Sequence, residues 1–216
     1  MSELATKRGW VSERLLEEFP KLGLTLATVE LKRALGRSPR AVRERLALMA
    51  DRFRGADAVV LRQRPVPHAY RVFFRHIGLD PDVTRVPAEA AAVKRLLHGG
   101  FPSQGLLQDA LTIAVMETGV PVWALDADTV TGKPGLRLSG AAERLGEGDG
   151  AMPLPPGRIV VGDERAPLAL LFGETATERV VTRATRRVLL FAVRVDGVEA
   201  IEVDEALWAA GETLLS

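Results

Sequence analysis

The order of its periodic segments is the sequence feature that most constrains how this 216-residue chain folds. Apolar residues recur at helical spacing through much of about the first 120 residues, and short apolar runs typical of strands prevail after them. Strands therefore do not alternate regularly with helices, which predicts an α+β fold rather than a doubly wound parallel sheet. We expect helices at 12–19, 38–53, 68–77, 87–98, 103–118 and the C-terminus, and strands at 22–31, 56–61, 122–125, 136–138, 158–162, 168–172, 187–195 and 200–203.

Serine and proline mark three of the expected helix starts. Ser12, Ser38 and Ser103 stand where an N-cap is expected, and Pro39 follows Ser38 at the first helical position. A serine side chain at an N-cap accepts a hydrogen bond from a backbone N–H of the first turn. We therefore expect each of these serines to cap its own helix.

The chain is predicted to form one domain over residues 1–216, because it holds no internal repeat and no linker long enough to separate two domains. Within it we distinguish an N-terminal part of helices and strands at 1–67, a central part at 68–195, and a C-terminal strand and helix at 196–216. The expected architecture is a mixed or antiparallel sheet flanked by helices.

The chain has no cysteine, which removes disulfides, thiolate nucleophiles and Cys-ligated zinc or iron–sulfur sites. Its three histidines stand far apart, so we expect no metal site and no cofactor. The longest apolar runs cover about six residues, far short of the roughly 18 that span a bilayer. Because the N-terminus also lacks an apolar signal core, we expect a cytoplasmic protein with no membrane partner.

Charge is distributed unevenly along the chain. Residues 31–95 carry 15 Lys and Arg against 6 Asp and Glu, whereas residues 96–216 carry 10 against 17. An arginine-rich helix face can bind phosphate oxygens, which predicts a nucleic-acid footprint in the basic segment. The alternative is a solvated face paired with acids from the second half. The candidate contacts in this segment are Arg40, Arg43, Arg45, Arg71 and Arg75.

Polar residues in the middle of the chain are the other candidates for a site. Asp109 stands between Leu107 and Leu111 on an expected helix, and with Thr112 on the next turn it could converge with Glu89. The plainer interpretation of Asp109 is structural, as a carboxylate that accepts hydrogen bonds from a nearby turn.

Several blocks of the sequence, taken in order, resemble the B3/B4 domain of the phenylalanyl-tRNA synthetase beta chain. The resemblance covers roughly residues 68 to 195, and the whole chain is similar to the stand-alone bacterial form of that domain. No catalytic synthetase core is present. The blocks are Tyr70-Arg71 with Gly78-Leu79-Asp80-Pro81, Arg85 to Ala90, Gln108 to Thr112, Glu117 to Pro121, Asp126-Ala127-Asp128 with Gly132 and Leu136-Arg137, Gly157 to Val160, and Val181 to Thr185.

The resemblance implies a B3/B4-like α+β fold and a function on tRNA. In the synthetase this domain forms the editing site that hydrolyses tyrosine wrongly attached to the phenylalanine tRNA. The resemblance implies that this chain binds tRNA or an aminoacyl-tRNA and deacylates it in trans. The residues present are compatible with this chemistry, because ester hydrolysis needs only a positioned water and an oxyanion environment. The implied pocket residues are Glu89, Asp109, Thr112, Asp126 and Arg137.

The chain departs from the family pattern at three positions. Ala88 stands where the family often has serine, Thr112 where it has asparagine, and Arg158 where it has the glutamate of Gly-Glu-Ile-Val. Glutamate can accept a hydrogen bond from a phenolic hydroxyl, whereas a guanidinium has no acceptor. Arg158 is therefore expected to favour an anionic ligand group, unless Asp163 or Glu164 neutralises it.

Two other functions remain open: a non-catalytic module that holds a small anion or an amino acid, and a protein-interaction domain that keeps only the scaffold. A basic band beside the pocket favours RNA binding. A closed, apolar cavity favours the small-molecule module, and a filled pocket beside an exposed apolar patch favours the interaction domain.

Overall fold

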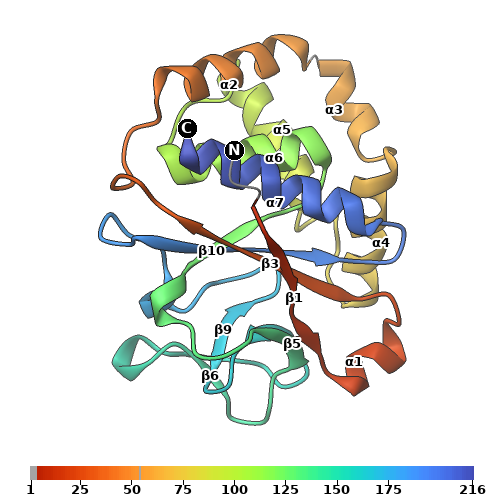
Figure 1. Ribbon diagram of the computed structural model, residues 1–216. Coiled ribbons are helices and arrows are strands. Elements are labelled where there is room, and N and C mark those ends of the chain that lie inside the picture. Colours follow the sequence, from red (N-terminus) through yellow and green to blue (C-terminus); the bar gives the residue numbers. More distant parts are fainter. Residues whose placement is uncertain (1–3, 54) are drawn as a thin grey trace.

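The computed structural model describes residues 4–53 and 55–216; Arg54, one charge of the basic segment, lies outside this range. It has most of its helices on one side of a central sheet, and a second sheet with the short first helix on the other side (Figure 1). The helices are α1 (Glu13–Glu18), α2 (Arg40–Arg52), α3 (Gly55–Leu61), α4 (Pro65–His76), α5 (Pro87–His98), α6 (Leu106–Thr118) and α7 (Ala200–Leu215). The strands are β1 (Thr6–Arg8), β2 (Trp10–Val11), β3 (Gly23–Glu30), β4 (Trp123–Asp126), β5 (Gly135–Leu138), β6 (Arg144–Leu145), β7 (Met152–Pro153), β8 (Ile159–Gly162), β9 (Pro167–Leu170) and β10 (Arg187–Arg194).

The central sheet is antiparallel, with the strand order β1-β3-β10-β4. Its two long strands, β3 and β10, pair over eight residues, from Gly23 opposite Arg194 to Glu30 opposite Arg187. Six consecutive residues of β10, from Val188 to Val193, are buried. These six residues are apolar because α7 packs on the sheet and the second sheet covers part of its other face.

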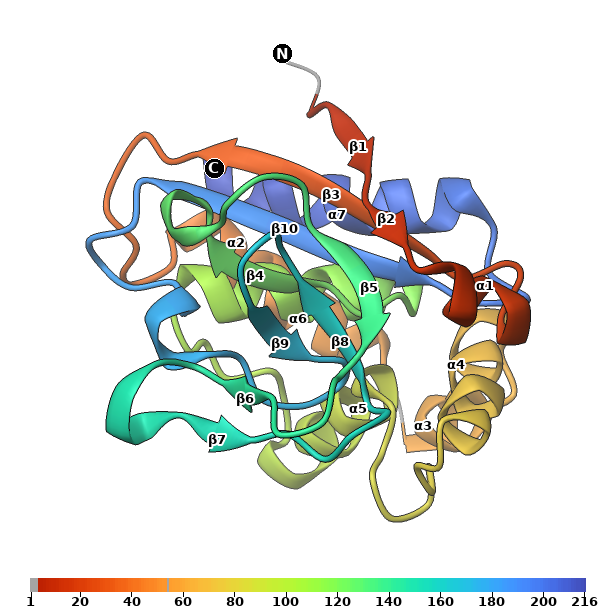
Figure 2. The same ribbon diagram turned by 90° about the horizontal axis from the view of Figure 1, so that it is seen from below.

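The second sheet has the order β2-β5-β8-β9 (Figure 2). Strand β2 is parallel to β5, and the other pairs are antiparallel. Because β1 and β2 are separated by Gly9 alone, the N-terminal segment passes from one sheet directly to the other. A Cβ at Gly9 would lie 2.7 Å from the side chain of Leu24 and from the carbonyl oxygen of Pro134, so only glycine fits this crossing.

The observed helices and the mixed and antiparallel sheets confirm the predicted α+β class. Two predicted strands are wrong. Residues 56–61 belong to α3, where Leu61 joins Phe53 and the helix residues Ala88 and Ala92 in a separate buried cluster. Residues 200–203 open α7, because Glu199 and Glu202 form a capping box there. In both segments the run of apolar residues was too short to distinguish a strand from a helix.

The predicted serine caps are also wrong in part. Ser12 occupies the N-cap position of α1 but its side chain makes no capping hydrogen bond. The N-cap of α2 is Pro39 and that of α6 is Gly105. Ser38 and Ser103 lie just outside these helices, and both hydroxyls donate to Asp109.

Within the described residues, no helix is long and apolar enough to cross a membrane.

Candidate functional site

A solvent-open hollow of about 780 Å³ lies where the loops before α2, α6 and β10 meet. Three arginines from three of its segments, Arg37, Arg43 and Arg183, line this hollow, which we call the arginine hollow. In the described part of the chain none of the three forms an ion pair with a carboxylate. Three positive charges are therefore available to an anion in one place. The lining residues are Leu35, Gly36, Arg37, Arg43, 103–108 and 181–183.

Asp109 holds one wall of the arginine hollow in place. Its side chain is buried on the first turn of α6. One carboxylate oxygen accepts hydrogen bonds from the hydroxyls of Ser38, at 2.5 Å, and Ser103. The other accepts from the backbone N–H of Gln104 at 2.8 Å. Asp109 thus ties the loop before α2 to the loop before α6, which confirms its structural interpretation.

Asp126 holds another wall of the hollow in place. It ends β4, where one carboxylate oxygen accepts from the backbone N–H of Asp128 and the other from the hydroxyl of Thr185 at 2.5 Å. Thr185 Oγ1 in turn accepts from the backbone N–H of Thr182 at 3.0 Å. These bonds fix the turn that carries Arg183 to the rim of the hollow. Both aspartates therefore act on the hollow through the loops that they hold.

Glu89 lies in a different cluster. The buried guanidinium of Arg71 donates to both carboxylate oxygens of Glu89, at 3.0 and 2.9 Å, and to Asp82 at 2.6 Å. The hydrogen bond from Arg71 holds the pKa of Asp82 below its ordinary value. Arg71 joins α4 to α5 and the loop between them, so its prediction as a nucleic-acid contact is wrong: only 6% of the residue is exposed.

The predicted convergence of Glu89, Asp109 and Thr112 is not observed in the described residues. The carboxylate of Glu89 is bonded to Arg71 and that of Asp109 to the two serines. The hydroxyl of Thr112 donates to the carbonyl oxygen of Gln108, one turn back on its own helix. A shared helix face could not predict this, because the partners of Asp109 come from loops before the helices.

Arg137 and Arg158 lie on the second sheet. Arg137 forms a two-pronged ion pair with Glu143, and this pair lowers the pKa of the Glu143 carboxyl. Arg158 precedes β8, and its backbone exchanges hydrogen bonds with Ser139 at 2.7 and 3.0 Å. Its guanidinium has no ion pair among the described residues. Neither Asp163 nor Glu164 forms an ion pair with it in that part of the chain, and the Asp163 carboxylate accepts hydrogen bonds from three backbone N–H groups.

The remaining predicted contacts on the basic segment have acidic neighbours. Arg40 pairs with Glu44 on the same helix, and Arg75 lies 3.9 Å from Asp82. Arg45 forms a two-pronged pair with Glu117, an acid from the second half of the chain. Of the five arginines predicted to contact nucleic acid, only Arg43 lines the arginine hollow.

Sequence reasoning missed Arg37 and Arg183 as a pair. Arg37 stands in the basic segment, whereas Arg183 stands in the acidic second half of the chain. The one sequence signal for Arg183 was its place in the block Val181 to Thr185, which resembles a block of the B3/B4 domain. Net charge by segment could not join the two, because the loops meet only in the fold.

An aromatic cluster fills the space between β4, α4 and the turn after β9. Phe172 lies at its centre, with ring centroids 4.5 Å from Phe74 and 5.2 Å from Trp123. Tyr70 and Phe73 complete its surroundings. This space is therefore packed with side chains, and the arginine hollow is a separate, open feature.

Comparisons with known proteins give a partial match. No protein-family model matches the chain. It is 34% identical over 114 residues to the phenylalanine–tRNA ligase beta subunit of Xanthomonas campestris, and 33% identical over 114 residues to that of Xanthomonas oryzae. The same subunit of Xylella fastidiosa is 34% identical over 116 residues. These matches cover 52 to 53% of this chain and 14% of each relative.

The chain is therefore homologous over about half its length to the beta subunit of phenylalanyl-tRNA synthetase. It spans only a small share of those relatives.

Proposed function

We propose that this protein binds tRNA or the end of an aminoacyl-tRNA at the arginine hollow, as a B3/B4-like domain. The observation that carries the proposal is the convergence of Arg37, Arg43 and Arg183 without carboxylate partners in the described structure. Guanidinium groups bind phosphate oxygens in a two-pronged geometry and stack on bases. The homology to a tRNA ligase subunit makes tRNA the natural source of those phosphates.

The exposed amides of Gln104 and Gln108 lie on the same lining as the arginines. An amide both donates and accepts hydrogen bonds, so these side chains suit base edges and ribose hydroxyls. The arginines would supply most of the affinity, and the amides would supply the contacts that depend on the nucleotide.

Binding is a better-supported function than deacylation. The carboxylates that the resemblance implied for the pocket, Glu89, Asp109 and Asp126, each accept hydrogen bonds from the protein itself. None of the three lines the arginine hollow, whereas a group that positions a hydrolytic water must lie within hydrogen-bond reach of the substrate. We therefore treat aminoacyl-tRNA hydrolysis as a second activity of the same site, to be measured in the same assay.

The test compares two triple variants that lose the same charge. R37Q/R43Q/R183Q removes the arginines of the hollow, and R14Q/R85Q/R165Q removes three exposed arginines that line neither described hollow. Unfractionated tRNA is titrated by fluorescence anisotropy at several salt concentrations. We expect the hollow variant to bind at least about tenfold more weakly and to lose roughly two units of the log–log salt slope, since each phosphate contact contributes about 0.7 to 0.9.

Equal losses in the two variants would show that the attraction depends on net charge and not on the hollow. Salt-insensitive binding, or none at low salt, would remove the RNA proposal. Release of amino acid from any of the twenty aminoacyl-tRNAs, with loss in the hollow variant alone, would add deacylation to it.

A small anion is the second candidate ligand. The hollow lies within the 300 to 1,000 Å³ typical of small-molecule sites. Calorimetry with inorganic phosphate and with a mononucleotide distinguishes the two functions. Tight binding of either, with no competition from tRNA, would favour a small-molecule module.

A further inference from the structure

A second and larger hollow, of about 1650 Å³, lies at the edge of the central sheet. It follows β3 between the C-terminal half of α7 and the loop from β4 to β5, and we call it the edge hollow. Its volume exceeds the range typical of small-molecule sites, which favours an extended ligand. This hollow has no part in the function proposed above.

The edge hollow follows an incompletely paired strand. Strand β10 pairs with β3 along all eight residues, from Gly23 to Glu30. Strand β1 pairs on the other side only from Thr25 to Ala27. Among the described residues no strand therefore lies beside Thr28–Glu30, and all three residues line the hollow. An open edge of this kind can accept an added strand through its main-chain groups.

One side of this edge is apolar. Val29 faces α7, since a Cβ at Gly211 would lie 3.5 Å from its side chain. The same Cβ would lie 2.5 Å from Leu4, whose carbonyl oxygen accepts from the indole of Trp208 at 3.0 Å. Trp208 and Leu215 are 41% and 36% exposed. Alternate side chains of an added strand would meet this apolar wall.

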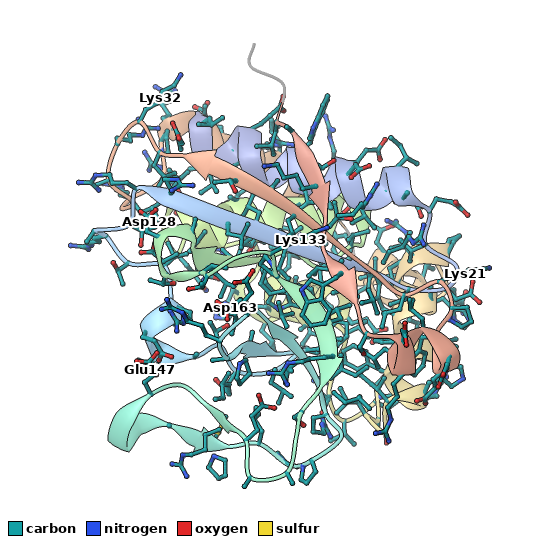
Figure 3. The ribbon with its side chains drawn as sticks, turned by 60° about the horizontal axis from the view of Figure 1, so that its bottom comes forward. Lys21, Lys32, Asp128, Lys133, Glu147 and Asp163 are labelled. Carbon is teal, nitrogen blue, oxygen red and sulfur yellow. The ribbon has the colours of Figure 1, made fainter. Side chains whose placement is uncertain are left out.

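The other side is basic. Lys7 lies opposite Leu26 in the β1–β3 pair and shares its face, away from α7. Lys133 stands on the loop from β4 to β5, and Lys32 follows the end of β3 (Figure 3). Three of the five lysines in the chain thus line one hollow. None of the three has an ion pair within the described residues, whereas Lys21, outside the hollow, pairs with Asp196.

We propose that the edge hollow binds an extended peptide segment of a partner protein in which acidic and apolar residues alternate. The free edge of β3 pairs with its main chain, the apolar wall takes every second side chain, and the lysines take the carboxylates between them. The lining also holds Glu30, Asp128 and Glu212. These acids disfavour a nucleic acid, because its backbone carries a charge at every phosphate, whereas a peptide places carboxylates only beside the lysines.

The probe is a dye-labelled eight-residue peptide of alternating valine and glutamate, titrated by fluorescence anisotropy against the full chain. We expect K7E and K133E each to weaken binding at least about tenfold, because the new carboxylates in the lining repel the glutamates of the peptide. The matched control is K94E, which makes the same charge change at an exposed lysine of α5 outside the hollow, and we expect it to bind within about twofold of the unmodified protein.

Three further measurements complete the test. A peptide methylated on every backbone nitrogen cannot pair as a strand, so we expect it not to bind. The R37Q/R43Q/R183Q protein should bind the peptide normally, which separates this proposal from tRNA binding. No binding of the alternating peptide, equal loss in K94E, or stronger binding of a ten-nucleotide RNA that K7E and K133E abolish would each overturn the proposal.

Discussion

At the scale of the residue, the side chains that form the most hydrogen bonds hold loops and helices in place, and these segments carry the exposed groups. Asp109 joins two loops, Asp126 fixes the turn of Arg183, and Arg71 links two helices. A buried carboxylate that accepts several hydrogen bonds is a costly group to alter, because each donor is left without its acceptor. The exposed arginines can vary at much smaller cost in stability.

Replacing Asp109 with asparagine should therefore affect stability and binding together. The amide keeps one acceptor oxygen but sets donors against the hydroxyls of Ser38 and Ser103, so we expect a loss of about 2 kcal/mol in the free energy of unfolding. Urea denaturation measures this loss. The control is D51N, at an exposed aspartate on α2. If D109N unfolds like the unmodified protein yet loses its ligand, Asp109 serves the site directly.

Phe172 has a backbone conformation that is unusual for its type. Its φ is +59°, in the left-handed region, while its ring contacts four other aromatic rings. We expect F172A to cost about 3 kcal/mol in packing. F172G loses the same contacts but removes the backbone strain, so it should be about 1 kcal/mol more stable than F172A.

The same pair of substitutions at Phe191, in β10, is the matched control. That residue is in a regular strand, where glycine is less favourable than alanine. The order of stability should therefore reverse between the two sites in thermal unfolding. The same order at both sites would contradict the strained conformation of Phe172.

At the scale of the element, α7 owes its start to a local motif and its position to the sheet. Glu199 and Glu202 cap its first turn reciprocally, and the backbone N–H of Glu199 donates to the Glu202 carboxylate at 2.8 Å. Its buried residues, among them Val203, Leu207 and Leu214, recur at helical spacing and pack on β3 and β10.

We expect E202A to lower the free energy of unfolding by about 1 kcal/mol, because it removes the acceptor at the start of the helix. E205A, at an exposed position of the same helix, should change it by less than about 0.5 kcal/mol. Urea denaturation compares the two variants. Equal losses would mean that the capping box adds nothing beyond intrinsic helix propensity.

At the scale of the whole molecule, folding rearranges the charge asymmetry of the sequence. Arg45 from the basic segment is paired with Glu117 from the acidic half, and Arg71 is buried between two carboxylates. Both are thereby removed from the set of possible ligand contacts. Among the described residues, arginines without an ion pair line one hollow and lysines without an ion pair line the other. The net charge of a segment therefore indicated a basic surface but could not locate it.

The sequence by itself determined the α+β class and most of the long helices and strands, and it offered a structural role for Asp109 as one of two interpretations. The fold class and the elements follow from local periodicity, and the interpretation of Asp109 follows from the cost of burying a charge. Both can be inferred from neighbouring residues. The tertiary structure alone decided that 56–61 is helical, that Ser38 and Ser103 bond Asp109, and that Arg37, Arg43 and Arg183 share one hollow. Each of those outcomes depends on contacts between segments far apart in the chain, and such contacts leave no local pattern for a sequence to display.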